Sequence, residues 1–394
     1  MTAVREMIIA DEASLQECCR HIDNHAVIGL DTEFIGENTY LPDLCLIQIS
    51  TPERLMLIDP LSVGKLDCFW ERVVQSNRVI VVHAGREELR MCWQATKVLP
   101  QKVADLQLAA GLLGYGYPIG YASLISLVLR IRVRKGETLT NWRKRPLSPN
   151  QIHYAYDDVR YLLPMWQRME FELKKLDRLS WLDEEIARLK QLVDVETPTV
   201  EKWRKIKGVG SLDRRKLAIV REIFAWRELK AARLNRPPRS VLRDDLIVEI
   251  ARRDPQVEQD LHTLRGLGKI DYSGVVSSVA LARKLDLDQC PETAERDSDT
   301  PRLQMLTSIF NAILNDLCNR KHLSSSLVCS SSDVRYLIRN YQESHVVPED
   351  SRLIQGWRGQ HLLPELLLFL AGKRGLRLNP SSYKSPFEYL DLPG

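Results

Sequence analysis

Val27-Ile-Gly-Leu-Asp-Thr-Glu-Phe34 is the stretch from which both the fold and the candidate chemistry of this chain follow. Its apolar residues indicate a buried, central strand. Because side chains alternate along a strand, Asp31 and Glu33 project from one side while Thr32 points to the other. Two carboxylates in apolar surroundings are costly unless cations lie between them, which favours a divalent-metal site. An edge strand whose acids simply face water is the alternative that this stretch alone leaves open.

The length and composition of the chain are those of an ordinary globular protein. Its 394 residues predict two or three domains, at one domain per ~150 residues. The hydrophobic content of 44% and charged content of 27% argue against global disorder. There is no run of ~18 apolar residues and no basic-then-apolar leader at the N-terminus, so we expect a cytoplasmic protein without a membrane partner. The eight cysteines form no Cys-x-x-Cys pair, which argues against zinc and a disulfide framework.

The formal net charge of +4 conceals an asymmetry along the chain. The segment 201–284 carries 20 Lys and Arg against 11 Asp and Glu, a net charge of +9, so the remainder carries −5. A basic middle joined to a mildly acidic first part suggests that one domain holds a polyanion, with nucleic acid as the leading candidate. A solvated helical surface of mixed charge would give the same count.

The pattern of the first 190 residues predicts one α/β domain with a mixed sheet. Strands that follow one another closely, separated by Thr51-Pro-Glu53, indicate an antiparallel meander. Alternation of strands and helices continues beyond it. The expected elements are, in order, a helix at 12–24, strands at 27–34, 44–50 and 54–59, a helix at 66–75, a strand at 79–83, a helix starting at Arg86 and a strand at 102–106.

Two further acidic positions stand out in this first part. Glu87 and Glu88 follow His83-Ala-Gly85 in the first turn of a helix, where the helix dipole favours carboxylates whether or not they have a function. Tyr154 and Asp158 are four residues apart in a helix at 152–163 and therefore share a face. Each of these two signals is weak evidence of a functional site on its own, since acids and tyrosines often lie on helix surfaces. Their combination with the first stretch is informative.

In combination, these motifs resemble the DEDD superfamily of 3′ to 5′ exonucleases and, within it, the bacterial ribonuclease D family. The resemblance covers about the first 180 residues and implies a ribonuclease H-like α/β exonuclease fold. The tyrosine of the third motif marks the subclass. The motifs that carry the resemblance are Leu30-Asp-Thr-Glu-Phe34, His83-Ala-Gly85 with the acidic pair and Leu89, Asp105-Leu-Gln-Leu-Ala-Ala110, Thr140-Asn-Trp-Arg-Lys-Arg-Pro-Leu147, and Tyr154-x-x-x-Asp158 followed by Tyr161-Leu-Leu-Pro164.

The resemblance implies a role for each acidic motif. Asp31, Glu33 and Asp158 would be metal ligands, and Tyr154 would orient the attacking water. Two divalent ions, Mg²⁺ or Mn²⁺, suit oxygen ligands and the hydrolysis of a phosphodiester. The family's second motif carries Asp where this chain has Glu88, so the extra methylene moves that carboxylate by about one bond. We expect Glu88 to be a catalytic and metal-ligating residue as well.

The basic segment at 201–285 predicts an all-helical bundle. A long helix at 213–234 is followed by helices at 243–252, 257–264 and 273–285. The bundle resembles the HRDC domain that ribonuclease D shares with RecQ-type helicases, through Arg214-Arg-Lys-Leu217, Trp226-Arg227 and the turn at 238–245. The expected phosphate-binding residues are Lys205, Lys207, Arg214, Arg215 and Lys216. After a polar linker at 286–302, we expect residues 303–380 to form a helical unit, whose position resembles that of the second HRDC-like domain of ribonuclease D.

Two classes of function remain open from the sequence. The first is a metal-dependent 3′–5′ exoribonuclease that trims RNA 3′ ends and releases nucleoside 5′-monophosphates, with structured RNA bearing a single-stranded 3′ end, namely tRNA precursors, as the implied substrate. The second is a nuclease-like RNA-binding protein weakened in catalysis by the altered second motif. DNA proofreading by the same chemistry is a third option, without a polymerase region to accompany it. We expect a monomer.

Overall fold

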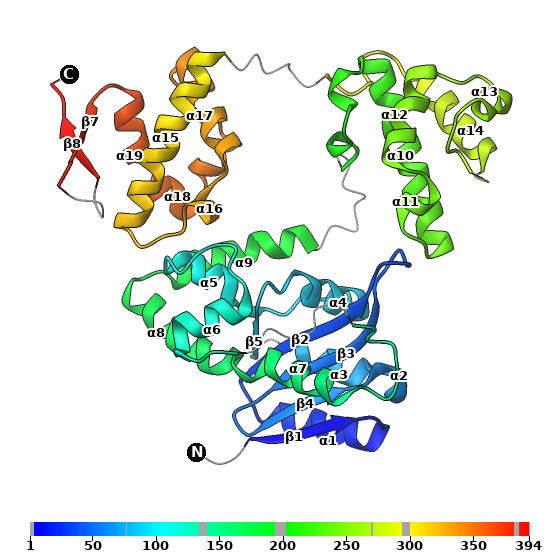
Figure 1. Cartoon of the computed structure of the whole chain (residues 1–394), viewed down its shortest axis with the longest axis vertical. Coiled ribbons are helices and arrows are strands. Elements are labelled where there is room, and N and C mark those ends of the chain that lie inside the picture. Colours follow the sequence, from blue (N-terminus) through cyan, green and yellow to red (C-terminus); the bar gives the residue numbers. More distant parts are fainter. Residues whose placement is uncertain are drawn as a thin grey trace.

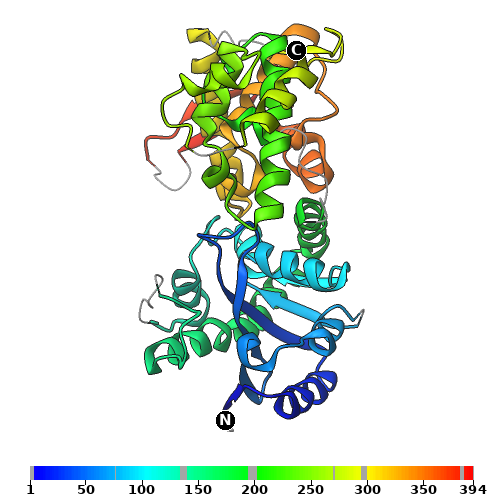
Figure 2. The ribbon, with the colours of Figure 1, turned by 90° about the vertical axis from the view of Figure 1, so that its right-hand side faces the viewer.

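The computed structural model describes residues 4–75, 77–133, 140–193, 202–268, 271–293, 300–381 and 386–393. These residues form an N-terminal α/β domain and two helical units (Figure 1). Figures 1 and 2 both place the two helical units on the same side of the sheet domain. The expected architecture of a mixed-sheet domain followed by helical bundles is therefore confirmed.

The sheet of the first domain has six strands within the described residues, in the order β1-β4-β3-β2-β5-β6. β2 runs antiparallel to β3 and parallel to β5, and β3 runs antiparallel to β4, so the expected meander is present. β2 is interior to the sheet, which excludes the edge-strand alternative. The strands are β1 Arg5–Ile9, β2 Val27–Ile35, β3 Asp43–Ser50, β4 Arg54–Ile58, β5 Val79–Val82 and β6 Lys102–Asp105.

Strand β1 was not anticipated from the sequence. It lies at the edge of the sheet, parallel to β4, and only its last residue, Ile9, is buried. A strand so exposed has no clear hydrophobic alternation, and its place is decided by pairing with β4. It leads into α1, which begins after the capping box formed by Asp11 and Ser14.

The helices of this domain cover the sheet. α3 packs against both α1 and α4, and α7 packs over β2, β3 and β4. Their bounds are α1 Glu12–Asp23, α2 Pro60–Val63, α3 Asp67–Val73, α4 Arg86–Thr96, α5 Leu106–Leu112, α6 Tyr121–Leu129, α7 Pro149–Arg160, α8 Leu162–Lys175 and α9 Leu179–Val193. The helix expected at 152–163 is thus two helices, with the break at Tyr161.

The basic helical unit has a hydrophobic core of its own, built from Trp203, Ile219, Ile247 and residues that pack with them. The long helix α10 contacts both α12 and α14 and forms the axis of the unit. Its elements are the 3₁₀ turns η1 Lys202–Lys205 and η2 Val209–Ser211, followed by α10 Arg214–Leu234, α11 Pro238–Val241, α12 Asp244–Arg253, α13 Glu258–His262 and α14 Tyr272–Arg283. The domain boundary expected at 197–199 lies outside the described residues.

The C-terminal unit, by contrast, shares one core with the α/β domain. α16 packs on α5, and α18 packs on α9. Arg358 and Glu185 form a fully buried ion pair between the two parts, and the indole nitrogen of Trp357 donates to the same carboxylate at 2.9 Å. The unit consists of α15 Pro301–Arg320, α16 Ser325–Val328, α17 Ser331–Ser344, η3 Arg352–Ile354, α18 Gly356–His361, α19 Leu363–Leu370, β7 Arg374–Leu378 and β8 Phe387–Asp391.

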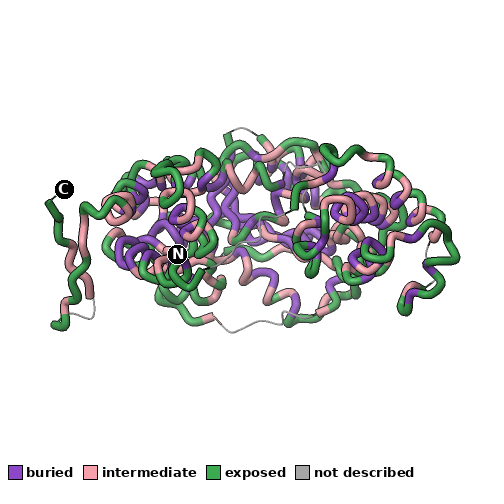
Figure 3. The backbone as a smooth tube through the Cα atoms, turned by 90° about the horizontal axis from the view of Figure 1, so that it is seen from above, coloured by how far each residue is buried: buried purple, intermediate pink, exposed green. Residues whose placement is uncertain are grey.

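The hairpin of β7 and β8 was also not anticipated. Figure 3 shows it at the edge of the molecule, where its backbone is exposed or intermediate, while the buried segments lie inside the two cores. No helix in the described part of the chain is long and apolar enough to cross a bilayer.

Candidate active site

Four carboxyl groups from three elements gather beside the central strand. Asp31 and Glu33 lie on β2, Glu88 on the first turn of α4, and Asp158 on α7. The negative charges of Glu88, Asp158 and Glu33 all act on Asp31, whose pKa is raised well above its usual value, with burial as the largest cause. The structure therefore brings together the four acids that the three motifs predicted.

Strand β2 presents its two acids as alternation requires. Asp31 and Glu33 are half-buried, and Thr32 between them is buried. The Asp31 carboxylate accepts the backbone N–H of Thr32 at 2.9 Å, which fixes its orientation. Burial, followed by the charge of Glu88, raises the pKa of Glu33 to about 7.

Glu88 is the most buried of the four acids, with 6% of its surface exposed. Its Oε1 accepts a 2.8 Å hydrogen bond from the Thr32 hydroxyl. Burial raises the pKa of Glu88 to about 7, partly offset by hydrogen bonds from Thr32 and from its own backbone. Glu87 instead pairs with Arg90 at 2.5 Å. Of the acidic pair, it is therefore Glu88 that faces β2.

The turn before α4 is held by a residue that the sequence analysis left without a role. Asp105, buried at the end of β6, accepts the backbone N–H groups of Ala84 and Gly85 at 3.1 and 2.9 Å. A Cβ on Gly85 would lie 2.2 Å from a methyl of Val82, so only glycine fits there. Asp105 also caps α5. An Asp directly before a helix signals a cap, but nothing in the sequence signals its reach to residue 85.

Helix α7 delivers the third motif. Its N-terminus is a capping box of Ser148 and Gln151, which fixes where the helix starts and so which side chains face the sheet. Asp158 is half-buried, and burial followed by the charge of Glu33 raises its pKa to about 8. The Tyr154 hydroxyl hydrogen-bonds Asp158, and burial next to this carboxyl raises the pKa of Tyr154. The phenol is therefore a neutral hydrogen-bonding group at physiological pH.

The loop before α7 is anchored to the sheet rather than free. Arg145 binds both oxygens of Asp59 at 2.6 and 2.7 Å. The ring of the buried Trp142 lies 6.0 Å from that of Tyr154 and restricts its position. The segment 140–147, one of the motifs that carry the resemblance, thus contacts the tyrosine of the third motif.

Tyr121, at the start of α6, is a further residue of the site that sequence analysis missed. Burial and then the charges of Asp158 and Asp31 raise its pKa well above the usual value, so it lies within electrostatic reach of the cluster. Its hydroxyl donates to the carbonyl of Asp157 at 3.4 Å, and its ring lies 5.3 Å from that of His83. The position of Tyr121 in the sequence has no recognisable spacing from the motifs, so only the folded structure shows that it lies near the acids.

The donor set of the cluster fits hard divalent cations. Within the described residues, the groups that interact electrostatically in the cluster are carboxyls and one tyrosine, so every available ligand atom is oxygen. Four carboxylates whose pKa values are all raised by burial and by neighbouring acids are an unfavourable arrangement unless cations or protons neutralise them. Oxygen ligands of this kind select Mg²⁺ or Mn²⁺ over softer metals.

The basic residues expected to touch phosphate have different surroundings. Arg214 and Arg215 donate to main-chain carbonyls, of Cys290 at 2.9 Å and of Ala282 at 3.1 Å, and so fasten the end of the bundle. Lys216 pairs with Asp213 at 3.1 Å. Lys205 and Lys207 are exposed. Phosphate contact by these five residues stays a prediction.

Comparison with known families finds two matches. Residues 7–174 match the model of a 3′-5′ exonuclease domain, and residues 216–274 match the HRDC domain. The first range contains all four clustered acids and Tyr154. The second lies within the helical unit that has its own core.

Similar proteins extend over most of the chain. Ribonuclease D of Sphingobium indicum is 31% identical over 357 residues, covering 88% of this chain and 92% of that protein. Ribonuclease D of Desulfotalea psychrophila is 33% identical and covers 81% and 84%. The crystal structure of Escherichia coli RNase D, described as an exoribonuclease involved in structured RNA processing, superposes with a TM-score of 0.78 at 27% identity and covers 92% and 98%.

Proposed function

The chain belongs to the ribonuclease D family of metal-dependent 3′–5′ exoribonucleases, and we propose that it trims the single-stranded 3′ ends of structured RNA, with tRNA precursors as substrates. The family assignment confirms the resemblance drawn from the three motifs and makes the protein an RNA hydrolase. The natural RNA, a monomeric state and a cytoplasmic location stay predictions.

The carboxyl cluster is the observation that carries this proposal. Asp31, Glu33, Glu88 and Asp158 come from β2, α4 and α7, and each of them has its pKa raised by burial and by neighbouring acids. Repulsion between these carboxylates destabilises the fold unless the carboxylates bind cations. We infer that these four residues hold two divalent ions, Mg²⁺ or Mn²⁺. Ions bound there would lower the pKa of a water and stabilise the charge that develops on the phosphate oxygens.

The residues around the cluster would position the reactants. Tyr154, neutral and hydrogen-bonded to Asp158, has a hydroxyl that can orient the attacking water without ionising. Thr32 holds the Glu88 carboxylate, and Asp105 holds the turn that precedes it. These two residues act on the geometry of Glu88 and are positioning residues.

The alternative of a weakened, RNA-binding homologue depends on Glu88. Its carboxylate is not turned away to solvent but is buried and bonded to the strand of the first motif. This placement supports an intact site, because the longer side chain is accommodated within the cluster. We therefore propose an active enzyme.

Incubation of the purified protein with RNA tests the proposal. The substrate is a hairpin RNA with a single-stranded 3′ tail, labelled at its 5′ end, in Mg²⁺ or Mn²⁺. We expect stepwise shortening from the 3′ end and release of nucleoside 5′-monophosphates, both blocked by EDTA. If the RNA stays intact in Mg²⁺ and also in Mn²⁺, the proposed exonuclease activity is wrong. If a DNA hairpin is cut equally well, the proposed preference for RNA is wrong. The comparison of a pre-tRNA that carries a 3′ extension with a mature tRNA tests whether tRNA precursors are substrates.

A further inference from the structure

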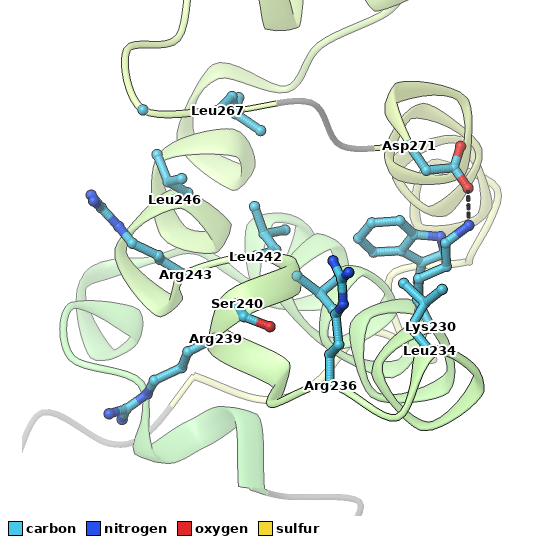
Figure 4. Close-up of a pocket in the computed structure, with 14 residues that line it drawn as sticks. Lys230, Leu234, Arg236, Arg239, Ser240, Leu242, Arg243, Leu246, Leu267 and Asp271 are labelled. Atoms are coloured by element: carbon cyan, nitrogen blue, oxygen red, sulfur yellow. Dashed lines mark hydrogen bonds and ion pairs between the residues drawn. The ribbon is translucent and has the colours of Figure 1, made fainter. Parts of the chain in front are cut away.

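The helical domain contains a pocket of about 400 Å³ that none of the roles above uses (Figure 4). It lies between the C-terminal half of α10, α11, the start of α12 and the segment 266–268. Its floor is apolar, with Leu242 and Leu246 buried, and Trp226, Leu267 and Leu234 add further apolar surface. The cationic residues that line it are Lys230, Arg236, Arg239 and Arg243.

The four cations differ in how far their charge is compensated. Lys230 pairs with Asp271 at 2.9 Å, and Arg239 pairs with Asp244 at 3.0 Å. Arg243 is bound by Asp245. Among the described residues, Arg236 has no ion-pair or hydrogen-bond partner for its guanidinium. In Figure 4 its side chain points towards the centre of the pocket, whereas Arg239 and Arg243 point outward from it. Of the four cations that the structure describes there, Arg236 is therefore the one whose positive charge is uncompensated above the apolar floor.

The end of α10 joins this pocket to the nuclease domain. Asn235 ends the helix in the left-handed conformation, and the backbone N–H of Arg236 turns back to the carbonyl of Ala231 at 3.0 Å. The Asn235 side-chain oxygen accepts the backbone N–H of Tyr40 at 3.2 Å, in the loop between β2 and β3. Adjacent residues thus contact the nuclease domain and line the pocket.

The same loop leads directly to the carboxyl cluster. Tyr40 follows Glu33 by seven residues, so their Cα atoms are at most ~24 Å apart along a fully extended chain. The hydroxyl of Tyr40 hydrogen-bonds Glu228 on α10, which adds a second contact between the domains. The pocket consequently lies at the end of the helical domain that faces the strand carrying the catalytic acids.

We propose that this pocket is a subsite for one unpaired nucleotide of the RNA whose 3′ end lies at the carboxyl cluster. The base would lie on the apolar floor beside Trp226, and a phosphate would face Arg236. This proposal rests on the proposed function, because it assumes that the same RNA is bound with its 3′ end at the carboxyl cluster. An apolar floor under the free guanidinium of Arg236 fits a nucleotide better than a bare phosphate, since stacking of a base on apolar and aromatic side chains adds to binding. Bases paired in a duplex cannot enter it.

Binding of RNA to full-length protein in EDTA, where no cutting occurs, tests the subsite. The probes are a fluorescent single-stranded RNA and a blunt duplex of equal length. Arg236→Ala and Leu234→Ser remove the free charge and an exposed apolar wall residue. Arg233→Ala and Leu229→Ser are matched controls on α10, because both residues are exposed and neither lines the pocket.

We expect each pocket variant to weaken binding of single-stranded RNA by about 5-fold or more, the effect of losing ~1 kcal/mol of base or phosphate contact. Arg236→Ala should also reduce the slope of log K against log salt by ~0.7. The controls and the blunt duplex should show no such change. Pocket variants that bind like their controls, or that lose duplex binding equally, would overturn the subsite. Hydrolysis by the wild type in Mg²⁺ is scored separately, so failure of the nuclease function is distinguished from failure of the pocket.

Discussion

The hydroxyl of Thr32 donates a 2.8 Å hydrogen bond to the Glu88 carboxylate and so ties the strand of the first acidic motif to the helix of the second. Asp31 precedes Thr32 and feels the charge of Glu88 more than that of either other acid in the cluster. This contact places the Glu88 side chain beside the two acids of the first motif.

Replacement of Glu88 separates an intact site from a weakened one. We expect Glu88→Ala to lower turnover on tailed RNA by at least ~10²-fold, the upper range for losing a partner that orients a metal ligand. Glu88→Asp should retain activity, because it keeps the carboxylate and shortens only its reach. Glu87→Ala is the matched control, since Glu87 pairs with Arg90 instead. Greater damage from Glu87→Ala than from Glu88→Ala would show that the wrong acid has been assigned.

Removal of a metal-ligating acid should abolish activity without unfolding the protein. Asp31→Asn and Asp158→Asn should each stop hydrolysis, while their melting temperature in EDTA should equal or exceed that of the wild type. The reason is that each change relieves repulsion among buried carboxylates. Wild-type turnover in either variant would contradict the proposed ligand set.

Added metal should offset the loss of stability that the carboxyl cluster causes as the pH rises. The folded-state pKa values of Glu33, Glu88 and Asp158 are raised to about 7, 7 and 8, so the metal-free folded state binds more protons than the unfolded state. This cluster therefore destabilises the protein increasingly from about pH 4 to pH 8. Mg²⁺ should raise the melting temperature more at pH 8 than at pH 6, because it competes with those protons. An equal increase at both pH values would argue against binding at these acids.

The buried pair of Glu185 and Arg358 should hold the C-terminal unit against the nuclease domain. Arg358→Met leaves the buried Glu185 carboxylate without its cationic partner and should cost about 3–5 kcal/mol of unfolding free energy. Burial raises the pKa of Glu185, but the hydrogen bond and charge of Arg358 and the hydrogen bond of Trp357 outweigh it and lower the pKa below its ordinary value of 4.5. The stabilisation is therefore present above that ordinary value and is lost as the pH falls through the lowered pKa. Urea denaturation from pH 7 to pH 3 would measure this.

Glu185→Gln provides the control for that titration, since it removes the ionisable group and keeps the shape. Its stability deficit relative to the wild type should shrink in acid, where the wild-type carboxylate also becomes neutral. A deficit that is constant from pH 7 to pH 3 would mean that the ion pair does not contribute to docking.

Replacement of residues 202–293 by a flexible linker should separate RNA affinity from chemistry. The removed unit has its own core, whereas the C-terminal unit shares its core with the nuclease domain and is therefore kept. We expect the shortened protein to retain hydrolysis of short single-stranded RNA but to bind tailed hairpins more weakly and with a smaller salt slope, by ~0.7 for each lost phosphate contact. An unchanged salt slope would show that the basic domain does not hold RNA.

The sequence alone determined the elements whose signals are local. Alternation along 27–34 placed Asp31 and Glu33 on one side of a buried strand, and helical spacing put Tyr154 and Asp158 on one face. The three motifs then identified the family. These signals need only the covalent geometry of one strand or helix, so they survive without knowledge of the fold.

Only the tertiary structure decided how separate segments meet. Contacts between segments far apart in the chain produce three of these features. They are the pairing of the edge strand β1, the hydrogen bond from Gly85 to Asp105 and the position of Tyr121 near the acids. The same holds for the shared core of the C-terminal unit and for the pocket around Arg236. Such contacts leave no periodic trace in the sequence, because the partners that define them are brought together by the packing of the sheet and helices as a whole.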